Sequence, residues 1–179
     1  MLYEPRALGL PMDNVIVRAA VASDAPFLRE MVREALRASP TFVSEVGLAE
    51  ILRREEEYWR NWSREPDPAL VATDAAGQQL GAVLLKLADR GRRIAIAVKS
   101  GARNRGVGRA LMACAAQTAR DLGAAYVCLY VDPCNAAAMA LYEKAGFVRV
   151  GARGSAVEMR VELFVDATPS SDPARRPSA

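Results

Sequence analysis

The first part of the chain shows one strand pattern followed by two helix patterns. Residues 14–20 (NVIVRAA) are rich in β-branched side chains and alternate in polarity, which predicts a strand. Residues 23–38 (SDAPFLREMVREALRA) begin with cap residues and a proline and then carry apolar positions at helical spacing, which predicts an amphipathic helix. Residues 48–62 predict a second helix with a weaker amphipathic pattern.

The rest of the chain continues with strand patterns and two further helices. Residues 66–98 contain three apolar runs separated by turn-rich segments of hairpin length, which predict an antiparallel meander. A helix that ends near residue 122, a strand at 124–131 of the kind buried on both faces, and a short helix at 135–146 follow. Residues 147–165 predict two more strands around a glycine turn.

The order of these elements predicts an α+β fold with a mixed sheet, in which one strand–helix–strand crossover spans residues 92–131. With 179 residues the chain fits a single domain, which we place at residues 14–166. Residues 1–13 and 167–179 have little to bury, so we expect two tails there, the C-terminal one disordered.

Composition and charge narrow the classes of function. The net charge of +3 comes from basic and acidic residues spread along the chain, so we expect no nucleic-acid partner. No apolar run approaches the roughly 18 residues that span a bilayer, and no signal-peptide core is present, so we expect a cytoplasmic protein with no membrane partner. The three cysteines form no C-x-x-C pair and histidine is absent, so we expect no metal.

The segment RNRGVGRAL (103–111) joins the last strand of the meander to the next helix. A helix that starts directly after a strand presents unpaired N–H groups and a positive dipole end, and glycines let an anion approach the backbone. The segment therefore indicates an anion site, although Gly106 and Gly108 alone would also suit a plain tight turn. It lacks the features of a P-loop and of a dinucleotide-binding fingerprint.

Two motifs in sequence order carry a family resemblance. Arg103, Gly106 and Gly108 form R-x-x-G-x-G after the strand end at 96–98, and NAAAMALYEKAGF (135–147) follows the next strand. Together they resemble the acetyl-CoA-binding motifs of the GNAT acetyltransferase superfamily, and the second is similar to the form in its ribosomal-protein alanine acetyltransferase subgroup. The resemblance implies an α+β, GNAT-like fold: a mixed, mostly antiparallel central sheet with a V-shaped split between the fourth and fifth strands, flanked by about four helices.

The resemblance also implies how acetyl-CoA binds. Backbone groups of residues 96–98 would pair with the pantetheine arm in the split, and N–H groups of residues 104–109 would bind the pyrophosphate, helped by three arginines. Asn135 matches the position that hydrogen-bonds the cofactor arm, and Tyr142 matches the tyrosine placed near the sulfur. The implied cofactor-binding residues are Ile96, Ala97, Val98, Arg103, Asn104, Arg105, Gly106, Val107, Gly108, Arg109, Asn135 and Tyr142.

Tyr142 and Asn135 each have a second interpretation. A phenol, with a pKa of about 10, suits a catalytic acid that protonates the departing thiolate, and we favour this role for Tyr142 over plain core packing. Asn135 also fits an ordinary helix cap, and the two roles are compatible.

The sequence departs from the family where a general base is expected. Tyr130 stands where the alanine acetyltransferase subgroup has a glutamate, and Arg92 and Arg93 stand where many relatives carry a carboxylate. These departures weaken the case for a protein N-terminus as acceptor but not the case for acetyl transfer. The substitutes, each of which fits a turn or surface carboxylate better than a base, are Asp89, Asp132 and Glu158.

The second predicted helix carries an acidic and aromatic cluster, and in this family the first two helices help to shape the acceptor site. Glu55, Glu56 and Glu57 would attract a cationic amine, and Trp59 or Trp62 would stack on it. The alternative, which we favour, is a solvated helix face with buried aromatic side chains.

We therefore interpret the chain as an acetyl-CoA-dependent N-acetyltransferase, an acyltransferase that acetylates the primary amine of a small molecule. A protein or peptide amine is the alternative acceptor, and a non-catalytic acyl-CoA-binding sensor is the alternative of another class. The sequence fits both a monomer and a homodimer.

Overall fold

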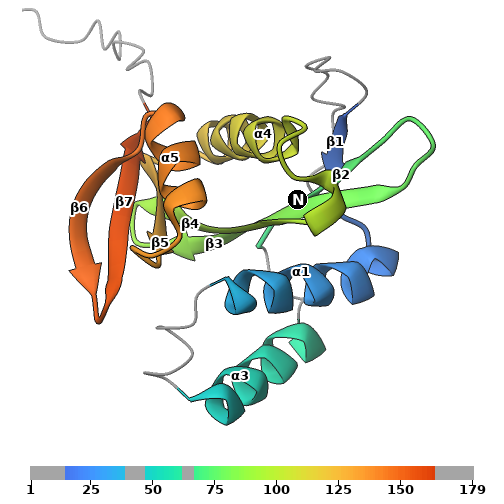
Figure 1. The fold of residues 1–179 in the computed structure, drawn as a ribbon, viewed down its shortest axis with the longest axis horizontal. Helices are drawn as coiled ribbons and strands as arrows, with labels where there is room; N and C mark the ends of the chain where they lie inside the picture. The colour runs from blue at the N-terminus through green and yellow to red at the C-terminus, as the bar shows by residue number, and fades with distance from the viewer. Residues whose placement is uncertain (1–14, 39–46, 62–66, 164–179) are drawn as a thin grey trace, which may run out of the picture.

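The structure of the protein, a computed structural model, describes residues 15–38, 47–61 and 67–163. In these ranges the chain follows the predicted order of strands and helices (Figure 1). The strands are β1 (Ile16–Ala19), β2 (Ala69–Thr73), β3 (Gln79–Ala88), β4 (Gly91–Val98), β5 (Tyr126–Val131), β6 (Val148–Arg153) and β7 (Ala156–Glu162). The helices are α1 (Ala25–Arg37), α3 (Leu48–Asn61), α4 (Val107–Asp121) and α5 (Ala136–Lys144), with 3-10 turns at Ala22–Asp24 and Ser100–Ala102. The predicted tails at 1–13 and 167–179 lie outside the described residues.

All the strands named above belong to one sheet, in the order β1-β2-β3-β4-β5-β7-β6. Neighbouring strands are antiparallel except for β4 and β5, which form a parallel pair with α4 as the crossover. This confirms the predicted α+β fold with a mixed, mostly antiparallel sheet and a crossover through residues 92–131.

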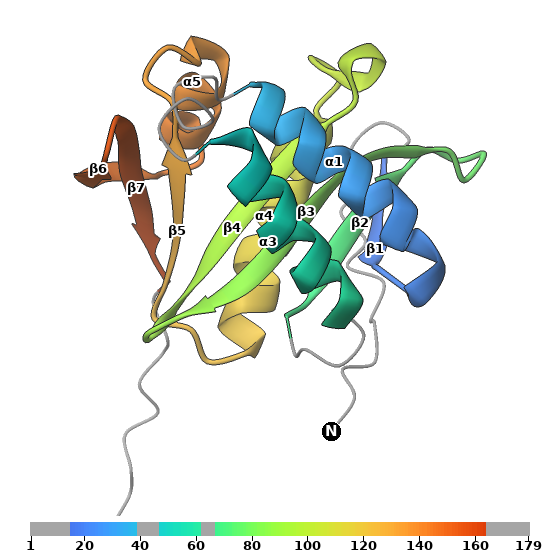
Figure 2. The ribbon, with the colours of Figure 1, turned by 90° about the horizontal axis from the view of Figure 1, so that it is seen from below.

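The parallel pair β4 and β5 opens into a V. Arg92 pairs with Val127 and Arg93 with Cys128, and within the described residues the pairing extends no further along the two strands. The closed end is fixed by the N–H of Ala125, just before β5, which donates to a carbonyl oxygen of the β3–β4 turn (2.8 Å). Figure 2 shows the strands diverging from this end toward the segment that leads into α4 and toward α5. The predicted split between the fourth and fifth strands is confirmed.

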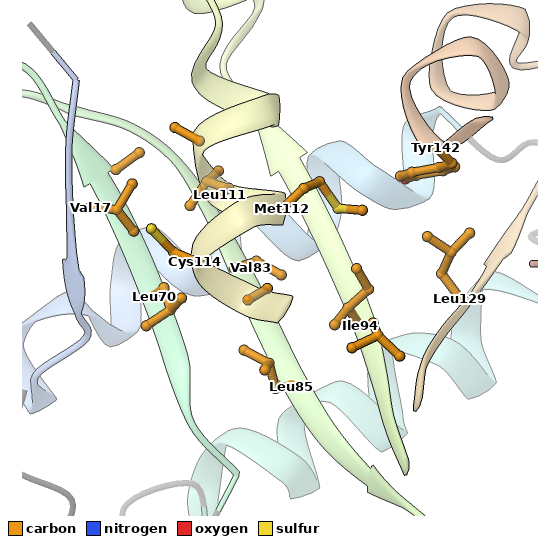
Figure 3. Close-up of a cluster of buried hydrophobic side chains, with 14 of the residues drawn as sticks. Val17, Leu70, Val83, Leu85, Ile94, Leu111, Met112, Cys114, Leu129 and Tyr142 are labelled. Atoms are coloured by element: carbon orange, nitrogen blue, oxygen red, sulfur yellow. The ribbon is translucent and has the colours of Figure 1, made fainter. Parts of the chain in front are cut away.

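Helices cover both faces of the sheet, and the alternation of side chains along the strands separates two cores. Val83 and Leu85 of β3 pack in the larger core with Leu111 of α4 (Figure 3). Leu84, between them, packs on the opposite face against Leu28 of α1. We call these two sides of the sheet the α4 face and the α1 face; α5 lies on the former and α3 on the latter (Figure 1).

Two findings bear on the partners expected from the sequence. Among the described helices none is long and apolar enough to cross a membrane. Residues 15–38, 47–61 and 67–163 contain no group of three or more cysteines and carboxylates placed to hold a metal ion.

Candidate active site

The turn between β4 and α4 forms the first part of the site. Asn104 (φ +59°) and Gly106 (φ +79°) adopt left-handed backbone conformations, and α4 begins at Val107, directly after Gly106. This conformation is easy for glycine and strained for residues with a Cβ atom, so the turn itself requires Gly106.

The backbone N–H groups of this turn are available to a ligand. In the part of the chain that the structure describes, no N–H group of residues 104–109 donates a hydrogen bond. These consecutive donors lie at the positive end of the α4 dipole, which favours a negatively charged partner. The turn therefore fits a multiply charged anion such as a pyrophosphate.

Gly108 has a packing role that the sequence did not reveal. A Cβ atom at this position would lie 3.1 Å from Cδ2 of Leu141 in α5 and 3.8 Å from Cγ2 of Val98 in β4. The missing side chain therefore lets α4, α5 and β4 approach one another at the open end of the split. Anion approach, the reason expected from the motif, is not the only reason for a glycine here.

The three arginines of the motif differ in their surroundings. Arg103 donates from Nη2 to Oε1 of Glu34 in α1 (2.6 Å) and from Nε to the carbonyl oxygen of Val98 (3.2 Å). Arg105 and Arg109 are exposed and form no ion pair within the described ranges. Arg105 and Arg109 are therefore the two guanidinium groups available to an anion, whereas Arg103 ties β4 to α1.

The backbone of β4 has an open edge along the split. The Lys99 N–H donates to the Leu80 carbonyl oxygen on β3 (2.9 Å), and the β3–β4 register continues without a shift. Backbone groups of successive residues point to opposite sides of a strand. The N–H and carbonyl of Ala97, two residues before Lys99, therefore point to β3 as those of Lys99 do. Ile96 and Val98 direct theirs toward the split, so they are the members of the predicted set that can pair with a ligand there.

Asn135 is the N-cap of α5. Its Oδ1 accepts a hydrogen bond from the Ala138 N–H (3.1 Å), and its Nδ2 donates to the carbonyl oxygen of Ala38 at the end of α1 (3.4 Å). The cap interpretation is thus confirmed. The second contact places Asn135 where α1 and α5 meet; its predicted contact with the cofactor arm stays a prediction.

Tyr142 of α5 is buried, with 7% of its surface exposed, and belongs to the larger core (Figure 3). Its ring packs at a tilt against Phe147, with centroids 6.0 Å apart. Burial raises the pKa of Tyr142 to about 12, and among the described residues the hydroxyl has no hydrogen-bond partner. Tyr142 therefore packs in the core and keeps a protonated, uncommitted hydroxyl, so the packing and acid roles are compatible.

The candidate bases fall in different environments. Asp132 is 4% exposed, and its Oδ1 accepts from the Cys134 N–H (2.9 Å), which fixes the turn before α5. Asp89 is exposed in the β3–β4 turn. Glu158 lies on β7 directly opposite Tyr130 of β5. Of the three, Glu158 alone is paired across strands with a residue of the split.

The acidic helix α3 is only partly described. The side chains of Glu55 and Trp59, and the whole of Trp62, lie outside the described residues. Glu56 and Glu57 are exposed, and Glu57 pairs with an arginine of its own helix (3.4 Å). The predicted attraction of a cationic amine to this helix stays a prediction.

A cavity of about 410 Å³ lies between α1 and the β4–α4 turn. Glu34, Lys99 and Arg105 are among its lining residues. Sequence reasoning missed Glu34, because its contact with Arg103 joins residues 69 positions apart. The only local signal was its position near the end of an amphipathic helix.

Comparison with known proteins agrees with these features. The sequence model described as "Acetyltransferase (GNAT) family" matches residues 29–147. A mycothiol acetyltransferase of Paenarthrobacter aurescens (strain TC1) is 35% identical over 108 residues, which cover 56% of this chain and 32% of that protein. The chain thus matches about a third of that relative's length.

Two solved structures share the fold. The PaiA N-acetyltransferase of Thermoplasma acidophilum in complex with coenzyme A aligns with a TM-score of 0.64 at 21% identity, covering 83% of this chain and 98% of that one. The ribosomal-protein-alanine N-acetyltransferase of Brucella melitensis aligns with a TM-score of 0.63 at 22% identity, covering 82% and 99%. The match of the family model over most of the domain shows that the chain belongs to the acetyltransferase (GNAT) family.

Proposed function

We propose that the protein is an acetyl-CoA-dependent N-acetyltransferase that acetylates the primary amine of a small molecule. The observation that carries the proposal is the row of N–H groups at 104–109, which donate to no described residue and lie beside an open-edged split. A turn that only reversed the chain would not need the positive charge that Arg105 and Arg109 add. The coenzyme-A-bound relative of the same fold supports this ligand.

The residues at the open end would hold the nucleotide part of acetyl-CoA. The N–H groups of 104–109 would donate to the pyrophosphate, and Arg105 and Arg109 would add charge-assisted contacts. The backbone groups of Ile96 and the carbonyl oxygen of Val98 would pair with the amides of the pantetheine arm, as a neighbouring strand would. When bound, acetyl-CoA supplies an acetyl group activated as a thioester.

Two groups of this chain would act on the reacting atoms. The N–H of Val98 would donate to the oxygen of the acetyl carbonyl as negative charge develops there. The hydroxyl of Tyr142 would donate its proton toward the departing sulfur. With a pKa of about 12, Tyr142 is a weaker acid than a solvent-exposed phenol, so it would act chiefly through a hydrogen bond that strengthens as the thiolate forms.

The proton on the attacking amine would leave without a dedicated carboxylate. Asp132 is committed to the turn before α5, and Asp89 is exposed in the β3–β4 turn. The amine would therefore bind in its neutral form or lose its proton to water.

The test is a coenzyme A release assay with a panel of polyamines, amino acids, aminoglycosides and peptides, run beside calorimetry of coenzyme A binding. We expect binding together with release that depends on one class of small amines. Binding without release from any amine would identify a sensor rather than an enzyme, and release with peptides alone would identify a protein acetyltransferase. Absence of coenzyme A binding would overturn the proposal.

A further inference from the structure

A row of charged side chains crosses the α1 face at the closed end of the split. Arg93 of β4 pairs in register with Cys128 of β5, which in turn pairs with Arg160 of β7. Side chains of residues paired in register project from the same face of a sheet. Neighbouring strands are about 4.8 Å apart, so the two arginines are about 10 Å apart at the backbone, with the small Cys128 between them.

The α1 face is the side from which an acceptor can reach a thioester in the split. The opposite face is filled by the larger core, where Leu129 of β5 packs with Met112 of α4 and Tyr142 of α5 (Figure 3). On the α1 face, Ala95 of β4 is exposed, although its β3 partner Leu84 is only 3% exposed. The surface next to Arg93 is therefore open to solvent beside the split.

Arg93 has positive charge that no described residue neutralises. It forms no ion pair and no hydrogen bond from its side chain within the described residues, although it is only partly exposed. Its neighbour Arg92, by contrast, lies 3.9 Å from Asp67. A half-buried guanidinium group with no carboxylate partner favours an external anion.

Arg160 is held in place but not satisfied. Its guanidinium lies 4.1 Å from the centre of the Tyr126 ring and 3.9 Å from one carboxylate oxygen each of Glu158 and Glu162. Its buried Nε has no hydrogen-bond partner among the residues that the structure describes. The aromatic contact orients the guanidinium, while its donors remain available to a better acceptor.

Cys128 does not neutralise these arginines. Burial is the main cause that raises the pKa of the Cys128 thiol. The thiol is therefore neutral near pH 7, and the two carboxylates near Arg160 lie at the long distance of 3.9 Å.

We propose that Arg93 and Arg160 bind the carboxylate of the acetyl acceptor, so that the acceptor is an amino acid or a similar small amine that carries a carboxylate. This inference rests on the proposed acetyltransferase function and specifies its acceptor. Glu158 lies two residues from Arg160 on β7, about 7 Å nearer the open end on the same face. Its carboxylate attracts the amino group, so the site presents positive and negative charge in the order of a zwitterion.

Arg93 also affects which amines can bind. An arginine there repels a polyamine and attracts an amino carboxylate.

The inference is tested with pairs of acceptors that differ in the carboxylate alone, such as alanine and alaninamide. We expect the wild-type protein to favour the amino acid of each pair in kcat/KM by about tenfold or more, mainly through KM. Arg93→Gln should abolish this preference while leaving coenzyme A affinity unchanged. The two acceptors of a pair also differ in the basicity of the amine. This difference is the same for the wild type and the variant, so it cancels when their preferences are compared.

Arg149→Gln is the matched control. Arg149 lies in register with Met159, on the α4 face of the same half of the sheet, and contacts Glu143 at 3.5 Å. Its replacement removes the same charge from the opposite face, so the preference for the amino acid should remain. Melting temperatures of both variants verify that each is folded.

Titration of the protein–coenzyme A complex with the amino acid measures the same site without turnover. Binding that Arg93→Gln weakens at least tenfold supports the assignment. Equal preferences in the wild type and Arg93→Gln, or binding of coenzyme A without binding of any amino carboxylate, overturn the inference while the proposed function stands. Failure to bind coenzyme A overturns both.

Discussion

The two helices that begin at the open end of the split, α4 and α5, start in opposite ways. α5 is capped by its own chain, since the Asn135 side chain accepts from the Ala138 N–H at 3.1 Å. α4 begins after Gly106, which has no side chain, and the N–H groups of residues 104–109 donate to no described residue.

The charges around the two helix starts are also opposite. The buried carboxylate of Asp132 lies in the turn that precedes α5, while the exposed Arg105 and Arg109 flank the start of α4. A helix start favours hydrogen-bond acceptors and negative charge. At α5 the chain supplies them through Asn135 and Asp132, whereas α4 starts beside a glycine and two arginines. The difference shows that the cap residue decides whether the N–H groups of a helix start are bonded within the protein or remain available to an anion. We therefore expect the largest losses of coenzyme A binding from changes at the start of α4, and losses of turnover or stability from changes to the Tyr142 hydroxyl and the Asn135 cap of α5.

Tyr142→Phe should give the largest effect and show what α5 contributes. The change keeps the buried ring and removes only the hydroxyl, so we expect kcat to fall by about ten- to a thousandfold, the range of acid–base catalysis, with coenzyme A affinity nearly unchanged. Because the pKa of Tyr142 is raised to about 12, kcat should show no ionisation of this group between about pH 6 and pH 10. Wild-type turnover in the variant, with chemistry limiting the rate, would leave Tyr142 a packing residue only.

Gly106→Val should weaken binding at the open helix start. A β-branched residue is strained at φ +79°, so the turn would shift its N–H groups and coenzyme A affinity should fall at least tenfold, about 1.4 kcal/mol. The matched control is Gly123→Val, at the other end of α4, where φ is +71° and a Cβ atom meets no atom of a described residue within 4 Å. Both variants should lose similar stability, and calorimetry that finds equal coenzyme A affinities for the two would contradict the prediction.

Asn135→Ala should test the closed helix start. Loss of the cap should lower the free energy of unfolding by about 1 kcal/mol, as measured by urea denaturation. Asn135→Ser keeps an oxygen that can cap α5 but loses the amide, so it should retain stability and lose about threefold or more in coenzyme A affinity. If Asn135→Ser binds coenzyme A like the wild type, Asn135 is a cap and no more.

Changes at the candidate bases should have the smallest effects, because Asp132 is committed to the turn before α5, Asp89 is exposed in the β3–β4 turn and Glu158 lies 3.9 Å from Arg160. Individual replacements Asp89→Asn, Asp132→Asn and Glu158→Gln should each lower kcat by less than about tenfold, or ~1.4 kcal/mol of barrier. The pH dependence of kcat/KM should instead follow the pKa of the acceptor amine and shift from one amine to another. A hundredfold loss of kcat in one variant, with binding preserved, would reveal a dedicated base.

The pattern along the chain was sufficient for the order of elements, and the resemblance of the two motifs to the family implied the split. Residues 83–85 are all apolar, so the pattern indicated a strand, and only the structure shows that Val83 and Leu85 face one side of the sheet and Leu84 the other. The two motifs flank β5, and this order matches a parallel crossover next to an opening in the sheet. The order of elements is local, so a pattern along the chain can carry it.

The contacts of the site could not be read from the sequence. The role of Arg103 at the anion stays a prediction, but its ion pair with Glu34 could not be foreseen, because only the fold brings the end of α1 beside the β4–α4 turn. The direction of the Ala97 backbone depends on the register between β3 and β4, which spacing along one strand does not define. Interactions between distant segments require the register and the packing, and neither is present in a local pattern.

Backbone amide NMR during a titration with coenzyme A tests the central claim most directly, since it reports on each helix start separately. The N–H signals of residues 104–109 should shift most and approach saturation together, because these groups gain hydrogen bonds to the pyrophosphate. The N–H signal of Ala138, already bonded to Asn135, should change little. Large shifts at the start of α5 with unmoved signals at 104–109 would contradict the assignment of the anion site to α4.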